Sequence, residues 1–307
     1  MLEEKIRQNG DKSALIPINR LEEMKSEIEH FRQNEKLNGF QEYITRNMYD
    51  FNIPETDFSI QSIILIASPA PVYARIIFNY EGQKIPSKCL ARSYPGKETP
   101  LITTEKYLTE FLTPKGYHIK LASQLPFKRL AVKSGLALYG RNNICFVEGM
   151  GSFLTFTAYF SDIPCDESTW YEVNQMNNCI KCTACLSNCP TGAISEDRFL
   201  INNERCLSYF NESPGKFPQW LPESVHHCIY DCLLCQIICP ENKNYINNVI
   251  GPIEFDENET GMLLSRKKME EFCNELREKV IFLGMDSWID AIPRNIEVLI
   301  RNYMKEK

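Results

Sequence analysis

Residues 179–190 read CIKCTACLSNCP, and they carry the most specific signal in the chain. The pattern is C-x2-C-x2-C-x3-C-P, with cysteines at positions 179, 182, 185 and 189. A cubane iron–sulfur cluster needs soft thiolates that converge from a tight loop. This spacing wraps three of them around one cluster and sends the fourth to a second cluster. The segment therefore predicts two [4Fe–4S] clusters, with a second cysteine segment elsewhere in the chain.

Residues 232–240, CLLCQIICP, supply that second segment, but they are one cysteine short of a full repeat. Cys206 or Cys228 could complete it, and the four-residue offset from Cys228 to Cys232 departs from the x2 spacing. We therefore favour Cys206 and leave Cys228 as a spare. The ligands assigned to the first cluster are Cys179, Cys182, Cys185 and Cys239, and those assigned to the second are Cys189, Cys206, Cys232 and Cys235.

Zinc is the alternative metal, because it also binds CxxC pairs. Zinc ribbons separate two such pairs by a long spacer and have no use for a third cysteine two residues on, or for the following proline. The chain has 13 cysteines in 307 residues, and in a reducing compartment such a density indicates metal ligands or redox groups rather than disulfides. We expect the remaining four cysteines to be small buried apolar side chains; they are Cys89, Cys145, Cys165 and Cys273.

The composition predicts a folded cytoplasmic protein. Hydrophobic residues make up 43% of the chain, which is enough to fill a core, and the formal net charge of −6 gives no overall reason to bind nucleic acid or an anionic membrane. The first residues are charged where a secretory signal would need an apolar core. The best apolar run, residues 63–67, is far shorter than a membrane-spanning helix, so we expect no membrane segment.

Helical and strand patterns are mixed through most of the chain. Residues 19–35 place Leu21, Met24 and Ile28 on one face of a helix, and residues 103–112, 126–135 and 264–307 also favour helices. The predicted strands are rich in β-branched and aromatic residues; they cover residues 58–67, 72–80, 116–122, 143–147 and 152–160.

These elements predict an α+β fold, in which a mixed α/β catalytic-type domain carries an inserted bacterial-ferredoxin-like 2[4Fe–4S] module and a short C-terminal helical segment. The expected organisation is an N-terminal helical segment, a mixed α/β domain, the two-cluster module and the C-terminal helical segment. Their predicted ranges are 1–48, 49–170, 171–250 and 251–307.

From about Ser134 to Asn242 the chain resembles the epoxyqueuosine reductases, which share a cobalamin-plus-two-cluster architecture with reductive dehalogenases. The segments that carry the resemblance are SGLALYGRNNICFVEGMGSFL, CIKCTACLSNCPTGAI, ERCLSYF and DCLLCQIICPEN. In that family the cysteine of the segment matching ERCLSYF is the displaced ligand. The resemblance therefore also implies that Cys206, rather than Cys228, binds the second cluster.

The resemblance further implies a cobalamin bound base-off, between the mixed α/β domain and the nearer cluster. The implied contacts are Tyr139, Gly140, Arg141, Asn142 and the turn Gly151–Ser152. Glycines permit close backbone approach to a large planar ligand, and arginine or asparagine can bond its peripheral amides. The plainer interpretation of the same residues is a pair of turns between strands with a solvated arginine.

Two departures from the family pattern bear on function. The family has an aspartate as proton donor ahead of the helix that leads into the glycine-rich segment, whereas residues 120–135, KLASQLPFKRLAVKSG, contain no acidic residue. Tyr94, Tyr139 or Glu148 could replace it. The longer family members also end in a helical-repeat domain that helps to hold tRNA. This chain ends soon after residue 291, so it is expected to be a short form for which tRNA is an improbable partner.

The other histidines have plain interpretations. We expect His226 and His227 to be a surface pair on a loop, although their position before the second cysteine segment would also allow them to tune a cluster potential. His118 alternates with its neighbours and is expected on a strand face.

Three functions follow as hypotheses. The first is a cytosolic corrinoid-dependent reductase, in which the two clusters relay electrons from an external low-potential donor of ferredoxin or flavodoxin type to cobalamin, for a small-molecule substrate. The second is an electron-transfer or activation protein that serves a corrinoid protein or another redox partner and has no substrate of its own. The third is an epoxyqueuosine reductase with a substituted proton donor.

Overall fold

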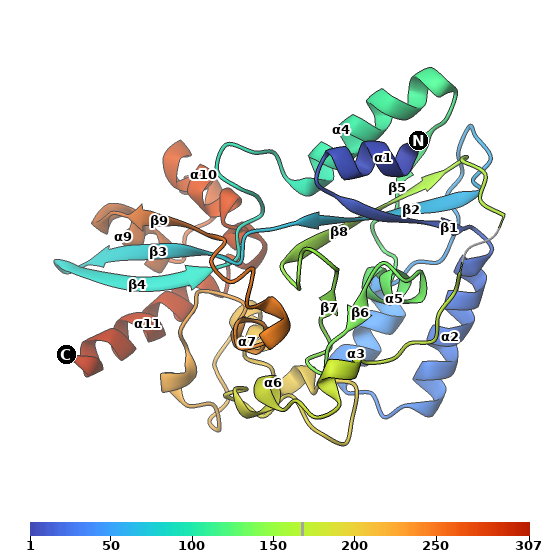
Figure 1. The fold of residues 1–307 in the computed structure, drawn as a ribbon. Helices are drawn as coiled ribbons and strands as arrows, with labels where there is room; N and C mark the ends of the chain where they lie inside the picture. The colour runs from blue at the N-terminus through green and yellow to red at the C-terminus, as the bar shows by residue number, and fades with distance from the viewer. Residues whose placement is uncertain (167–168) are drawn as a thin grey trace. The chain divides into compact units, whose positions relative to one another are not determined.

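The fold is described here from a computed structural model covering residues 1–166 and 169–307 (Figure 1). The chain divides into two compact units, each built from two separate segments. The first unit contains Met1–Pro69 and Glu98–Thr183, and the second contains Ala70–Lys97 and Ala184–Lys307. Each unit has its own sheet and its own core, so the two are described separately.

An antiparallel four-stranded sheet forms the centre of the first unit, with strand order β1–β2–β8–β5. Its strands are β1 (Lys12–Pro17), β2 (Ser62–Pro69), β8 (Leu154–Ser161) and β5 (Ile119–Leu121). Strand β2 is buried along almost its whole length, because it is central and pairs Ile64 with both Leu15 and Tyr159. Strand β1 is an edge strand that pairs only with β2.

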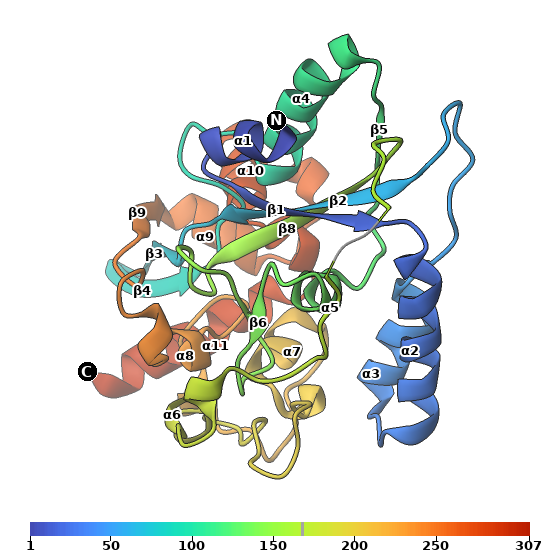
Figure 2. The same cartoon turned by 45° about the vertical axis from the view of Figure 1, so that its right-hand side comes forward.

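Helices cover both faces of this sheet. Figures 1 and 2 show α1 (Leu2–Gln8) and α4 (Pro100–Leu112) on one face, and α2 (Arg20–Asn34) and α5 (Phe127–Lys133) on the other. The first face is sealed by an apolar cluster in which Ile6, Leu108 and Tyr159 are almost fully buried. The short helix α3 (Gly39–Tyr43) follows α2 and begins with a capping box at Asn38. The first unit is thus a three-layer α/β arrangement.

A buried group of charges joins α2 to α5. Glu27 accepts hydrogen bonds from Lys133 Nζ and, at 2.9 Å, from Arg129 Nη2. The Lys133 side chain is 4% exposed, so its charge depends on this partner. Helix α5 ends at Lys133, and Gly135, two residues later, has a φ of +78° that suits a residue without Cβ. The ion pairs therefore fix the helix from which the next loop departs.

A small hairpin follows α5 in the first unit. Strands β6 (Leu138–Tyr139) and β7 (Cys145–Phe146) pair antiparallel, and the turn between them is closed by a 3.0 Å hydrogen bond from Asn143 N to the Gly140 carbonyl. A Cβ on Gly140 would lie 2.7 Å from Asn142 Oδ1 and from the Phe146 ring. Only glycine fits that close turn.

The second unit has a three-stranded sheet of order β4–β3–β9. Strands β3 (Tyr73–Tyr80) and β4 (Gln83–Cys89) form a hairpin, with Glu81 and Gly82 at positive φ in its turn, and β9 (Val249–Phe255) pairs parallel with β3. One apolar core joins this sheet to α9 (Glu257–Leu264), α10 (Asn274–Phe282) and α11 (Ile292–Glu306). The cysteine-bearing part of this unit contains only short helices, namely α6 (Ala184–Ser187), α7 (Leu207–Glu212) and α8 (Leu234–Ile237).

The mixed α+β fold with a C-terminal helical segment is confirmed, and so are the helix near residues 19–35 and the strands near 58–67, 72–80 and 152–160. Strands β1 and β9 were not predicted. The division of the chain departs from the predicted ranges, because β3 pairs with β9, about 175 residues later, and so belongs with the second unit instead of a domain spanning 49–170. Among the described residues, no helix is long and apolar enough to cross a membrane.

Candidate iron–sulfur centre and neighbouring pocket

The loop that carries Cys179 and Cys182 lies against the β6–β7 hairpin of the first unit. Met176 N donates to the Tyr139 carbonyl at 2.8 Å, and Tyr139 forms a parallel bridge with Gln175. The loop then turns tightly, with Cys179 N bonded to the Met176 carbonyl at 2.9 Å. The hairpin therefore supports the start of the first cysteine segment.

Arg141 makes the most extensive contacts with this loop. Its backbone N–H donates to Cys179 Sγ at 3.4 Å. Its guanidinium donates to three carbonyl oxygens of the loop: Cys179 at 2.7 Å, Cys182 at 3.1 Å and Ile180 at 3.3 Å. One residue of the hairpin turn thus binds both a candidate ligand sulfur and the backbone on either side of it.

The cysteines of the second candidate set lie near one another in the second unit. Burial, together with smaller contributions from the nearby Cys206 and Cys189, raises the pKa of the Cys232 thiol to about 12. Burial also raises the pKa of Cys206 and of Cys235, and Cys189 adds to both effects. Each of these thiols is thus near enough to at least one of the others to affect its pKa, and their assignment to one cluster stays a prediction.

Backbone N–H groups are directed at several of these sulfurs. Ala193 N donates to Cys189 Sγ at 3.3 Å. Burial of Cys189 acts to raise its pKa, but donors from Thr191, Ala193 and Ile194 outweigh it and hold the pKa of this thiol below its ordinary value. N–H donors to sulfur stabilise thiolate, which is the form that binds iron. All 13 cysteines lie among the described residues, and none of them forms a disulfide.

Among the described residues, no group of three or more His, Cys, Asp or Glu side chains is close enough to hold a single metal ion. A cluster places its own iron and sulfide between the cysteines, so its ligands need not meet at one point. Cysteines that form no disulfide, with backbone N–H donors at the sulfurs of Cys179 and Cys189, fit such a cluster.

Cys228 and the neighbouring histidines differ from the candidate ligands. Cys228 is 1% exposed, and its thiol donates to the Asp231 carbonyl at 3.0 Å. The expectation of a surface histidine pair is wrong. His226 is 4% exposed and bonds Asn211 Oδ1 through Nδ1 at 3.0 Å, and His227 Nε2 lies 2.9 Å from the Cys232 carbonyl oxygen. The side chains of His226 and His227 are thus packed inside the second unit, next to the second cysteine segment.

Of the four cysteines expected to be buried, Cys89 and Cys145 are buried and Cys165 is half-buried. The expectation is wrong for Cys273, which is exposed because it precedes α10 at the surface. His118 adjoins β5 as expected, and its Nδ1 lies 2.8 Å from Asp162 Oδ2.

The six residues implied as cobalamin contacts all lie in or beside the β6–β7 hairpin. Tyr139, Asn142 and Ser152 are each at most 7% exposed, and Gly140 and Gly151 are also buried. Arg141 is partly exposed and directs its guanidinium at the cysteine loop. Contact of these residues with a corrinoid stays a prediction, because the structure gives Arg141 other partners.

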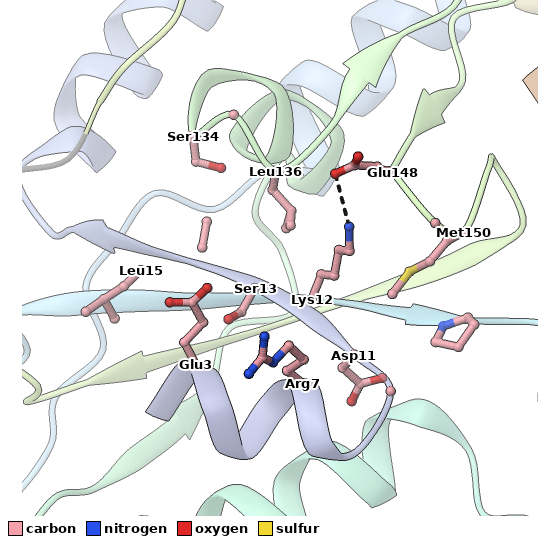
Figure 3. A pocket seen from close by; sticks show the side chains of 15 residues that line it. Glu3, Arg7, Asp11, Lys12, Ser13, Leu15, Ser134, Leu136, Glu148 and Met150 are labelled. Atoms are coloured by element: carbon pink, nitrogen blue, oxygen red, sulfur yellow. Dashed lines mark ion pairs between the residues drawn. The ribbon is translucent and has the colours of Figure 1, made fainter. Parts of the chain in front are cut away.

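A pocket of about 750 Å³ lies at the free edge of β1 in the first unit (Figure 3). The loop after α5 (residues 134–136), the turn after β7 (residues 148–150) and helix α1 form its walls. The turn after β7 is held by a hydrogen bond of 2.9 Å from Val147 N to the Gly151 carbonyl, so it adjoins the predicted contact pair Gly151–Ser152. Figure 3 shows Lys12 pointing at Glu148, with 3.5 Å between Nζ and Oε2.

Sequence reasoning missed one residue of this pocket, Asp11. It precedes β1, is 6% exposed, and accepts a hydrogen bond of 2.8 Å from the Tyr107 hydroxyl of α4. Burial raises the pKa of its carboxyl, although the bond from Tyr107 opposes the rise. No motif marks this aspartate, because it lies more than 100 residues before the cysteine segments.

The three residues named as substitutes for the missing acid are placed differently. Glu148 lines the pocket with its side chain 97% exposed. Tyr139 is buried, which raises the pKa of its hydroxyl well above the ordinary value. Tyr94 belongs to the second unit, where its hydroxyl accepts a hydrogen bond from Asn248. Of the three, only Glu148 lines the pocket.

Comparison with known proteins identifies the cysteine region. Residues 178–242 match the family described as a 4Fe–4S double cluster binding domain. The chain is 37% identical over 115 residues to the epoxyqueuosine reductase of Aliivibrio fischeri, which covers 37% of this chain and 30% of that protein. It is 34% identical over 184 residues to the epoxyqueuosine reductase of Francisella cf. novicida, covering 56% and 48%. The matches thus span less than half the length of these relatives.

Solved structures show that the fold extends over nearly the whole chain. An epoxyqueuosine reductase from Bacillus subtilis, with an aspartate-bearing catalytic loop swung out of its active site, superposes with a TM-score of 0.63 at 19% identity, covering 98% of this chain and 82% of that one. An epoxyqueuosine reductase bound to an epoxyqueuosine-modified tRNA stem loop gives a TM-score of 0.63 at 19% identity, covering 98% and 81%. At this identity the likeness shows the fold.

Proposed function

We propose that this chain, which is similar to epoxyqueuosine reductases and matches a 4Fe–4S double cluster binding domain over residues 178–242, is an iron–sulfur reductase that removes the epoxide oxygen of epoxyqueuosine in tRNA. The proposal rests on the kinship in sequence and fold. The reduction requires a path for electrons and a source of protons, and residues of the first unit are candidates for both.

The observation that carries the proposal is the position of the β6–β7 hairpin. Its turn at residues 140–143 bonds the loop that bears Cys179 and Cys182, and the turn after β7 lines the pocket. One short hairpin thus joins a candidate cluster loop to a cavity of about 750 Å³. This arrangement supports electron delivery from the cysteine loop toward a reactant in the pocket.

Removal of an epoxide oxygen as water consumes two electrons and two protons. Two clusters can each carry one electron at a time, and we assign an external low-potential donor of ferredoxin or flavodoxin type as their source. We place the protons with Asp11 and Glu148, two of the three carboxyl-bearing residues that line the pocket. Asp11 is the better proton donor, because burial raises its pKa toward the working range of a general acid.

Cobalamin enters this proposal through the family alone. When bound, it would supply a low-valent cobalt centre that passes electrons to the substrate. The residues proposed to hold it are the buried turn Gly151–Ser152 and the pocket-lining Gly149 and Met150, where the glycines leave room for a flat ligand. The chain's own residues then position the substrate, exclude water and donate protons.

The ligand assignment made from spacing remains part of the proposal. The first cluster is held by Cys179, Cys182, Cys185 and Cys239, and the second by Cys189, Cys206, Cys232 and Cys235. The proximity of the last four within the second unit supports the second set. Backbone N–H groups donate to the sulfurs of Cys179 and Cys189, one candidate ligand of each cluster.

Complementation tests the proposed function. A strain that accumulates epoxyqueuosine in its tRNA is given this chain, and the tRNA nucleosides are measured by mass spectrometry. Queuosine should appear with the wild-type chain and be lost with Cys232→Ala. Persistent epoxyqueuosine with a stably expressed, cluster-loaded wild-type chain would overturn the substrate assignment.

A second function is favoured by one observation, the absence of any acidic residue in residues 120–135. It is electron transfer to a corrinoid protein or another redox partner without a substrate of its own. In that case the purified protein reduces an acceptor protein but leaves epoxyqueuosine stem loops unchanged. Asp11→Asn separates the two, because only a reductase with its own substrate loses rate with this variant.

A further inference from the structure

We infer that Arg141 is a positioning residue for the first cluster, and that its fixed positive charge raises the reduction potential of that cluster above the value set by the cysteines alone. The inference rests on the ligand assignment proposed above, but it needs neither the corrinoid nor the tRNA substrate. Four hydrogen bonds, all within the first unit, carry it.

The shape of the β6–β7 turn explains why Arg141 reaches the cysteine loop. The β6–β7 turn is closed from both sides, by Gly140 N to the Ile144 carbonyl at 2.9 Å and by Asn143 N to the Gly140 carbonyl at 3.0 Å. Asn143 takes a positive φ of 60° to complete it. The backbone N–H of Arg141 is left pointing outward, where it meets Cys179 Sγ at 3.4 Å.

The Arg141 guanidinium donates to the carbonyls of Cys179, Ile180 and Cys182, so it bridges the backbone around two candidate ligands of one cluster. The planar, always charged arginine fork can satisfy several acceptors at once, whereas a lysine ammonium is a single point donor. The Arg141 guanidinium therefore holds the loop in a defined shape before iron binds, and it places a permanent positive charge beside the loop.

The positive charge of Arg141 bears on the reduction potential of the first cluster. Reduction adds a negative charge to the cluster, and cluster potentials respond to net charge and to hydrogen bonds at the sulfurs. A fixed cation and an N–H···S bond both favour the reduced form. Because the same hairpin continues to the turn that lines the pocket, Arg141 also fixes the first cluster's loop relative to that pocket. The residue would thereby set both the potential and the position of the electron donor to the pocket.

The experiment compares three variants of the full chain, reconstituted anaerobically with iron and sulfide. Arg141→Gln removes the charge and most of the fork, and Arg141→Lys keeps the charge but loses the planar fork. Lys181→Gln is the matched control, because Lys181 is an exposed cation on the same loop. Iron per chain is measured, and the midpoint potential of each cluster is found by redox titration with electron paramagnetic resonance.

We expect wild-type protein and Lys181→Gln to hold about eight irons per chain with the same two potentials. Arg141→Gln should shift one cluster to a more negative potential or reduce iron toward about four per chain, and leave the other cluster unchanged. Arg141→Lys should fall between them in both measurements.

Two clusters with wild-type potentials in both Arg141→Gln and Arg141→Lys would overturn the inference. A potential shift in Lys181→Gln as large as that in Arg141→Gln would also overturn it, because loop charge alone would then explain the effect. If wild-type protein itself held a single cluster, the ligand assignment would fail. That result is distinguishable, since it precedes any comparison of variants.

Discussion

The hydroxyl of Tyr107 donates a hydrogen bond of 2.8 Å to Oδ2 of Asp11, and this pair joins helix α4 to the residue before edge strand β1. Both side chains are at most 6% exposed. A buried carboxyl with one donor is less stable as an anion than in water, so burial raises its pKa. The folded protein therefore binds the Asp11 proton more tightly than the unfolded chain does.

The sign of the pH effect follows from that difference. The contribution of Asp11 to stability is fully present below the carboxyl's ordinary pKa, and it is lost as pH rises through the raised folded-state value. Asp11→Asn cannot ionise, so its free energy of unfolding relative to wild type should increase between about pH 4 and about pH 7. Urea unfolding at both pH values measures this. Asp57→Asn, at an exposed position, should show no such trend, and a flat difference for Asp11→Asn would contradict the prediction.

The two cysteines that compete for the second cluster should respond differently to substitution. Cys206 lies near both Cys189 and Cys232, whereas Cys228 is influenced by Cys232 alone of these two and its thiol donates to the Asp231 carbonyl. Cys206→Ala should therefore lower bound iron from about eight to about four per chain, and Cys228→Ala should retain about eight. Iron analysis after anaerobic reconstitution distinguishes them. The reverse pattern would exchange the roles of the two residues.

Sequence patterns predicted the cysteine segments because cluster ligation is local, and three thiolates within seven residues need no long-range information. The central strand β2 and the amphipathic helix α2 were predicted for the same reason, since the spacing of their own apolar residues indicates which side chains are buried. The division of the chain was not predictable in this way. It depends on the parallel pairing of β3 with β9, and no local pattern encodes that pairing.

Two misses have identifiable physical causes. Strand β9, VIGPIEF, contains Gly251 and Pro252, which read as a turn, but β9 is an edge strand where a proline without N–H is tolerated beside a shift in register. Asp11 was missed because its importance comes from a partner 96 residues away and from a pocket assembled by three separate segments. Sequence alone also misjudged His226, which was expected on a surface loop but is only 4% exposed.

His226 should make the protein sensitive to mild acid. Burial, together with a smaller contribution from the nearby Arg294, lowers its pKa from 6.5 to about 4. His226 binds a proton near pH 6.5 in the unfolded chain, but only near pH 4 in the folded protein. Stability is therefore lost as pH falls through that window, by at most about 3 kcal/mol.

Substitution of His226 by a neutral side chain should remove this loss. His226→Asn has no group that titrates in the window, so its free energy of unfolding should change less than that of wild type between about pH 7 and about pH 5. Denaturant unfolding followed by circular dichroism gives the two slopes. His30→Asn, on exposed helix α2, is the control and should keep the wild-type slope. Equal slopes for all three proteins would exclude His226 as the source.

The strongest prediction on stability concerns Glu27, which accepts hydrogen bonds from both Arg129 and Lys133 of α5. Glu27→Gln leaves the Lys133 ammonium buried at 4% exposure without a counter-charge. Breaking one side of such a pair costs about 3 kcal/mol, because the remaining charge is desolvated and unpaired. The free energy of unfolding should fall by that amount.

A matched control separates burial from charge. Glu22→Gln removes the same charge from the same helix, but its partner Lys25 lies 3.9 Å away with both side chains more than half exposed, so stability should change by less than about 1 kcal/mol. The double variant Glu27→Gln with Lys133→Met should regain part of the loss, because methionine needs no partner in that position. Similar losses from Glu27→Gln and Glu22→Gln would show that α5, and the pocket loop that follows it, does not depend on the buried ion pair.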